Sequence, residues 1–171
     1  MAEIAMEEFL LMHPELRNQY TLLSLIATES PRGMVLIAAA ELDRLLQELL
    51  SNYLRPGYGL KALLGESDGP LSTFSSKISL AHAIGLITDL EFRKLNLIRR
   101  IRNEFAHQTD ASFDKSPIKD RVRELANNDK GSGPEAFEFV STQLAFELEA
   151  ALRVAKEHSI GDRLSNRLYS P

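Results

Sequence analysis

Apolar residues recur along most of this 171-residue chain at spacings of three and four, which is the period of an amphipathic helix. No stretch shows the strict alternation of apolar and polar residues, enriched in β-branched types, that marks a strand. The pattern therefore predicts an all-α protein, and four long helices with shorter insertions indicate an up-and-down bundle. A long apolar stripe predicts the central core helix and contains Val35, Ala38, Leu42, Leu45 or Leu46, and Leu49.

Start and stop signals predict where these helices end. Ser30-Pro31 is typical of a helix start, because serine accepts from a free amide and proline needs no donor there. Thr88 and Glu91 have the spacing of a capping box, which predicts a helix start. Gly85 is expected to end the preceding helix. The predicted helical segments run from near Pro14 to Ser30, from Pro31 to the break at Arg55, over Leu60 to Leu64, from about Thr73 to Ile84, from Thr88 to about His107, from Pro117 through Leu125, and from Pro134 through Leu152.

The composition fits one globular domain, with 44% hydrophobic and 26% charged residues. We expect residues 1–160 to form a single helical domain and residues 161–171 to form a flexible tail, because no internal repeat or second domain is visible. The chain has 0 cysteines, which excludes disulfides, thiolate metal sites and a cysteine nucleophile.

The N-terminal stretch argues against export. Its first acidic residues, Glu3, Glu7 and Glu8, are accompanied by no lysine or arginine, the opposite of a secretory signal. The apolar run of residues 34–40 is far shorter than the roughly 20 residues that cross a bilayer. The sequence thus predicts a soluble, cytoplasmic protein that does not enter a membrane.

No metal site and no cofactor are predicted. His13, His82 and His158 lie far apart and lack metal-ligand spacing. The glycine-rich segments 57–59 and 65–69 lack the strand or lysine context of a phosphate-binding loop, and nothing resembles a nucleophile elbow.

The charge pattern argues against unaided DNA binding. The net charge is −4, a poor starting point for gripping a phosphate backbone. Basic residues gather only in segment 93–102, where nearby acids dilute them, and no helix-turn-helix is visible. Direct DNA binding is therefore predicted to be weak, and the basic segment is interpreted as a solvated helix face.

Segment 90–107 is the most informative part of the chain. At about 100° per residue its apolar positions, Leu90 included, share one arc, whereas Asn96, Arg100, Asn103 and His107 line the opposite face. Arg102 falls inside the apolar arc, where its guanidinium must reach solvent or find a carboxylate. Two candidate structural partners lie on the central helix, Glu41 and Asp43.

Arg102, Asn103 and His107 also resemble the Arg, polar, spacer, His pattern of the HEPN helical superfamily, several members of which are dimeric ribonucleases. That resemblance implies that His107 would manage a proton at the 2′-hydroxyl and that Arg102 would stabilise the phosphate oxyanion. The structural alternative is that Arg102 forms an ion pair and that His107 interacts with the carbonyls at the helix C-terminus.

Three stretches together resemble the mannitol operon repressor family, and they are residues 30–43, 65–84 and 99–107. The resemblance implies an all-helical bacterial protein that lowers expression of mannitol utilisation genes, or a paralogue with a related task. It implies no DNA-reading element.

The function predicted from the sequence is a non-enzymatic repressor that acts mainly through protein contacts. We expect a homo-oligomer and a protein partner from the transcription or phosphotransferase machinery. Glu41, Asp43, Arg100, Arg102, Asn103 and His107 are its candidate structural or interaction residues. Two alternatives stay open: a metal-independent ribonuclease using Arg102, Asn103 and His107, and a repressor whose basic surface forms only on dimerisation.

Overall fold

The structure is a computed structural model, and it describes residues 11–12, 17–65, 69–127 and 131–158. The predicted start near Pro14, the histidine at position 13 and the tail 161–171 lie outside these residues. All regular elements of the described part are helices, so the all-α prediction is confirmed. They are α2 (Arg17–Thr28), α3 (Pro31–Tyr53), α4 (Tyr58–Leu64), α5 (Phe74–Ala83), α6 (Asp89–His107), α7 (Ile118–Leu125) and α8 (Pro134–Glu157).

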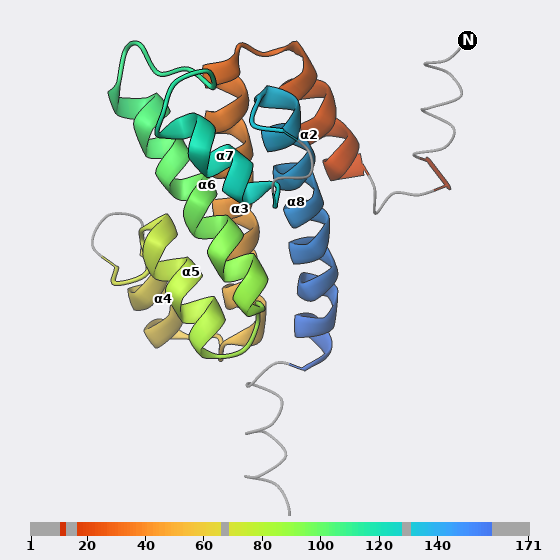
Figure 1. Cartoon of the computed structure of the whole chain (residues 1–171). Coiled ribbons are helices and arrows are strands. Elements are labelled where there is room, and N and C mark those ends of the chain that lie inside the picture. The colour runs from red at the N-terminus through yellow and green to blue at the C-terminus, as the bar shows by residue number, and fades with distance from the viewer. Residues whose placement is uncertain (1–10, 13–16, 66–68, 128–130, 159–171) are drawn as a thin grey trace, which may run out of the picture.

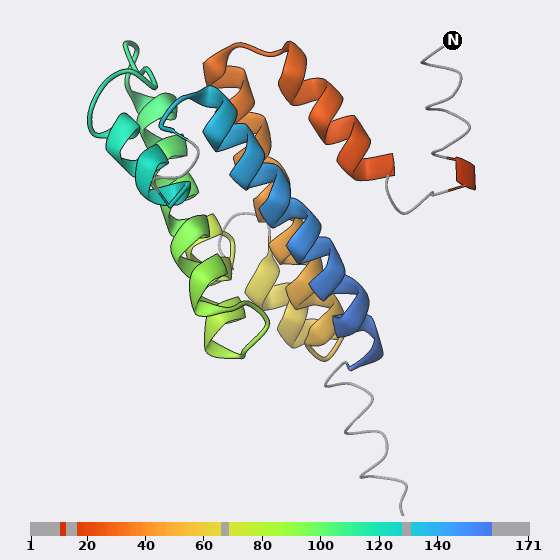
Figure 2. The same cartoon turned by 45° about the vertical axis from the view of Figure 1, so that its right-hand side comes forward.

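Helix α3 is the centre of the fold. It packs against α2, α5, α6 and α8, and α7 joins α6 to α8 at one end. The four main helices alternate in direction along the chain, with α2 and α6 running one way and α3 and α8 the other (Figure 1). Figure 2 shows α6 and α2 on opposite sides of the α3 and α8 pair. The predicted stripe on α3 is buried, as a core helix requires.

The helix ends follow local side-chain chemistry. Ser30 caps α3 by accepting from the Gly33 amide at 3.1 Å, and Thr88 and Glu91 form the predicted capping box of α6. Gly85 adopts a φ of +77° just after α5, a conformation that glycine reaches without strain. Helix α4 begins at Tyr58, earlier than the predicted Leu60.

Three aromatic rings tie the end of α6 to α8 through the intervening loop. Phe105 and Phe113 lie with ring centroids 5.0 Å apart, and Phe113 and Phe137 lie 5.8 Å apart. All three side chains are buried. Tilted pairs at these distances add to the free energy of burial, so the loop after α6 is held against the core.

A cluster of charged side chains lies between α3 and α8. Glu149 of α8 is buried, and its pKa is raised, first by burial and then by the neighbouring Glu41 carboxylate. Arg44 and Arg153 act in the opposite direction. Arg44 itself bonds Glu41 and Glu48, and these bonds raise the pKa of its guanidinium.

We expect the Glu149→Gln variant to be more stable than the wild type at neutral pH, by less than about 1 kcal/mol. Because the folded-state pKa lies above the unfolded one, the native state keeps a proton that the unfolded state releases in the window between the two pKa values. The free energy of unfolding therefore falls as pH rises through this window, and the glutamine removes that slope. Urea denaturation from pH 4 to pH 8 measures it, with Glu147→Gln on the same helix as the control. A slope that survives in Glu149→Gln would refute the assignment.

Candidate functional site

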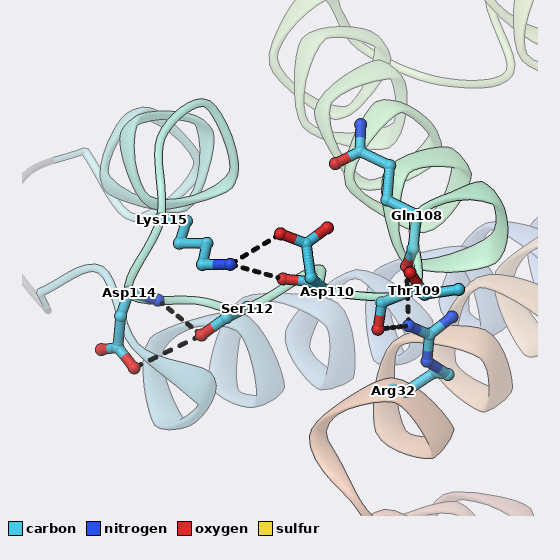
Figure 3. Close-up of polar contacts among 7 residues, drawn as sticks. All are labelled: Arg32, Gln108, Thr109, Asp110, Ser112, Asp114 and Lys115. Carbon is cyan, nitrogen blue, oxygen red and sulfur yellow. Dashed lines mark hydrogen bonds and ion pairs between the residues drawn. The ribbon is translucent and has the colours of Figure 1, made fainter.

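Arg32 of α3 closes the C-terminal end of α6. Its guanidinium donates to the Phe105 carbonyl, to the Gln108 carbonyl at 2.7 Å and to the Thr109 carbonyl at 3.1 Å. Figure 3 shows the side chain reaching from α3 to the last two of these carbonyls. The last carbonyls of a helix lack partners within it and carry partial negative charge, so a cation stabilises them. Arg32 makes these bonds, and a role of His107 at the same helix end stays a prediction.

The loop after α6 is ordered by its own polar contacts (Figure 3). Lys115 Nζ lies 2.7 Å from Asp110 Oδ2 and also donates to the Asp110 carbonyl. The Asp114 amide donates to Ser112 Oγ at 3.2 Å. Lys115 lowers the pKa of the Asp110 carboxyl, which is fully exposed. These contacts fix the path of the chain from α6 towards α7.

We expect Arg32→Met to lower the free energy of unfolding by about 1–3 kcal/mol, because three carbonyls lose a charged donor. Thermal and urea denaturation measure the change. Arg100→Gln is the matched control, since Arg100 is an exposed arginine of α6, and we expect it to change stability by less than about 0.5 kcal/mol. Equal losses in the two variants would show that net charge, not the helix end, is responsible.

A groove of about 630 Å³ lies between α3, the start of α5 and α6. Polar side chains dominate two of its walls, and the α3 wall is mostly apolar. The residues that line it are Leu36, Ala39, Ala40, Asp43, Ser72, Thr73, Phe74, Ser75, Arg99, Arg102 and Asn103. The groove therefore brings three of the candidate residues together, namely Asp43, Arg102 and Asn103.

Arg102 is exposed at this groove, and the expected ion pair with Glu41 or Asp43 is not formed. Its guanidinium instead donates to Asn103 Oδ1 at 3.1 Å. The helical wheel placed Arg102 within the apolar arc, but α6 faces the open groove at this position, not the core. Leu90, which the wheel places on the same apolar arc, is 46% exposed near the start of α6 and does not belong to the core.

The two carboxylates expected to bind Arg102 have other partners. Glu41 pairs with Arg44 of its own helix at 2.6 Å. Asp43 lies 2.8 Å from Lys77 Nζ, and Lys77 also donates to Gln47 Oε1 at 3.0 Å. Lys77 is 3% exposed, and it is not among the residues predicted from the sequence. Lys77 follows Phe74 by three residues and precedes Ile78, so it lies on the apolar side of α5. A lysine at such a position is the sequence signal that could have indicated a buried ion pair.

The remaining candidates lie outside the groove lining. Arg100 and His107 are both exposed on α6, and neither makes an ion pair or side-chain hydrogen bond within the described residues. Sequence reasoning also missed the pair between Glu104 of α6 and Arg121 of α7, which is partly buried. The structure therefore separates His107 from the groove that holds Arg102 and Asn103.

The described residues define an all-helical bundle with a polar groove beside its central helix. They contain no group of three or more His, Cys, Asp or Glu side chains that could hold a metal ion. No helix within the described ranges is both long enough and apolar enough to cross a membrane.

Comparison with known proteins identifies a fold but no family. The chain matches no family model and no curated protein. It is similar to a chain in the X-ray structure of the MtlR–HPr complex from Escherichia coli, with a TM-score of 0.57 and 19% sequence identity. The match covers 81% of this chain and 98% of that chain. At this identity the likeness shows the fold, and it agrees at that level with the resemblance to mannitol operon repressors.

Proposed function

We propose that this chain is a transcriptional repressor of mannitol or related carbohydrate utilisation genes, which acts through protein contacts and not through a DNA-reading element of its own. The observation that carries the proposal is the likeness of its fold to the MtlR–HPr complex chain, which extends over 98% of that chain. A partner from the phosphotransferase machinery, of the HPr type, follows from the same likeness.

The surface supports a protein partner better than a nucleic acid. The net charge of −4 opposes binding to a phosphate backbone. Apolar side chains are exposed on α2 and α8, including Leu25 at 49%, Phe146 at 39% and Val154 at 57%. Leu23 and Phe146 line a shallow groove of about 390 Å³ between these two helices. Aromatic side chains of this kind are enriched in the cores of protein interfaces.

Deleting the gene tests the regulatory role. We expect transcripts of the regulated sugar alcohol genes to rise in the deletion strain, and to fall again when the full chain is supplied from a plasmid. Unchanged transcripts across mannitol and related sugar alcohols would overturn the proposal. Homo-oligomerisation, which we propose as well, is measured separately by light scattering of the purified chain.

A ribonuclease is the second candidate, because Arg102 is exposed beside Asn103 and is not locked in a structural ion pair. His107 lies outside this groove, so the constellation would need a second subunit to complete it. If the chain is a ribonuclease, His107→Ala abolishes cleavage of single-stranded RNA while the melting temperature stays unchanged. We expect no cleavage by the wild type. Cleavage that His107→Ala removes would replace the regulatory proposal.

A further inference from the structure

The groove between α3, α5 and α6 holds two arginines that have no carboxylate partner within the described residues. Arg99 and Arg102 stand three residues apart on α6, a spacing that places both on one face of the helix. Their guanidinium groups contact only side-chain amides: Arg99 Nε lies 3.4 Å from Asn96 Oδ1, and Arg102 bonds Asn103 Oδ1.

Several other arginines of the described chain are paired with carboxylates, whereas Arg99 and Arg102 are not. Arg44 bonds two glutamates of α3, Arg121 bonds Glu104, and Arg123 lies 3.6 Å from Asp120. An unpaired arginine on an open surface is satisfied by water. Two of them converging on one concave surface produce a local positive potential, although the whole chain is negative.

The single carboxylate in the groove lining does not cancel this potential. Asp43 is held by Lys77 Nζ at 2.8 Å, and Lys77 is itself buried. The groove lining therefore carries two cations, Arg99 and Arg102, and one anion, Asp43, whose charge is balanced by Lys77 behind the lining. An anion that enters the groove meets two guanidinium groups that have no carboxylate partner among the described residues, and a carboxylate that Lys77 already pairs.

The opposite wall supplies hydroxyl groups. Ser72, Thr73 and Ser75 line it at the start of α5. Thr73 caps the helix by accepting from the Ser76 amide at 3.1 Å, which holds this wall in place. The volume of about 630 Å³ lies within the roughly 300–1,000 Å³ that small-molecule sites occupy.

We propose that this groove binds the phosphate group of a small phosphorylated molecule, with Arg99 and Arg102 holding the phosphate oxygens. Guanidinium groups match the geometry of phosphate oxygens and keep their charge at any physiological pH. The Asn103 amide and the hydroxyls of the α5 wall then face the uncharged body of the ligand. This site stands independently of the protein partner, so the regulatory proposal and this one fail or succeed separately.

Isothermal titration of the full chain with glycerol 3-phosphate, inorganic phosphate and glycerol tests the site. We expect glycerol 3-phosphate to bind with a Kd below about 1 mM and glycerol not to bind. Inorganic phosphate shows whether the ligand is a phosphorylated molecule or free phosphate. If inorganic phosphate binds more weakly than glycerol 3-phosphate, the ligand is a phosphorylated molecule. If the two bind equally, the ligand is free phosphate. Absence of binding by both phosphate compounds overturns the proposal.

Matched variants locate the binding. Arg99→Gln and Arg102→Gln are each expected to weaken binding of glycerol 3-phosphate at least tenfold, with circular dichroism unchanged. Arg100→Gln removes the same charge from the same helix outside the groove, and we expect it to leave the Kd within twofold. Equal weakening in Arg100→Gln and Arg102→Gln would show nonspecific charge attraction and overturn the site. The proposed site would also be overturned if the chain bound single-stranded RNA through Arg99 and Arg102 and did not bind glycerol 3-phosphate.

Discussion

The Phe105→Ala variant is expected to lose about 3–5 kcal/mol of unfolding free energy relative to the wild type. Phe105 is 1% exposed, and its ring contacts Phe113, which in turn contacts Phe137 of α8. Removing the ring leaves a cavity at the junction of α6, the following loop and α8, and these elements cannot all close on it. Urea denaturation followed by circular dichroism measures the loss.

Leu90→Ala is the control for this prediction. Leu90 lies on the same helix and is also apolar, but it is 46% exposed, so we expect a loss of less than about 1 kcal/mol. Similar losses in the two variants would mean that the end of α6 is not packed as the structure describes.

The second large effect concerns Lys77. We expect Lys77→Met to lower the free energy of unfolding by about 2–3 kcal/mol, because it leaves the Asp43 carboxylate without its cation. The side chain of Asp43 is 32% exposed, so water relieves part of the loss and keeps it below that of a fully buried pair. Methionine preserves most of the buried volume, which assigns the change to charge and not to packing. Thermal denaturation at neutral pH measures it.

A double-mutant cycle isolates the Lys77 and Asp43 interaction. We expect Lys77→Met with Asp43→Asn to recover part of the stability that Lys77→Met alone loses, a coupling of about 1–2 kcal/mol. Strictly additive losses would contradict a direct pair.

The Lys77→Met variant also leaves an uncompensated carboxylate, Asp43, in the groove. We therefore expect it to weaken binding of glycerol 3-phosphate there.

Helix positions and ends were predicted well, because local chemistry determines them. Ser30 and Thr88 need only the amides a turn away, and both form the caps that their sequence positions predicted. Gly85 follows the end of α5 because its backbone adopts a positive φ, a conformation that glycine reaches without strain. The apolar stripe predicted α3 as the central helix, because a 3.6-residue period is visible in the sequence alone.

The partners of charged residues were predicted poorly, because packing between helices determines them. Arg32 reaches carbonyls more than 70 residues away, and Lys77 reaches a carboxylate and an amide on α3. A wheel of α6 shows which residues share an arc, but not that the arc beside Arg102 faces an open groove. The expected pairing of Arg102 with α3 carboxylates failed for that reason.

The candidate site was predicted in part. Arg102 and Asn103 were identified on α6, and the structure places them in one groove with Asp43. The Ser72 to Ser75 wall was not identified, because only the packing of α5 against α3 and α6 brings it there. Roles for Arg100, His107 and Glu41 stay predictions.

Titration of the purified chain with HPr from the same organism and with operator DNA, at about 150 mM salt, tests the central claim most directly. We expect HPr to bind with a Kd at or below about 10 μM, and DNA to bind no more tightly than the roughly 10⁻⁴–10⁻⁶ M of nonspecific contacts. Nanomolar, sequence-selective DNA binding that weakens steeply with salt, together with no binding of HPr, would contradict it.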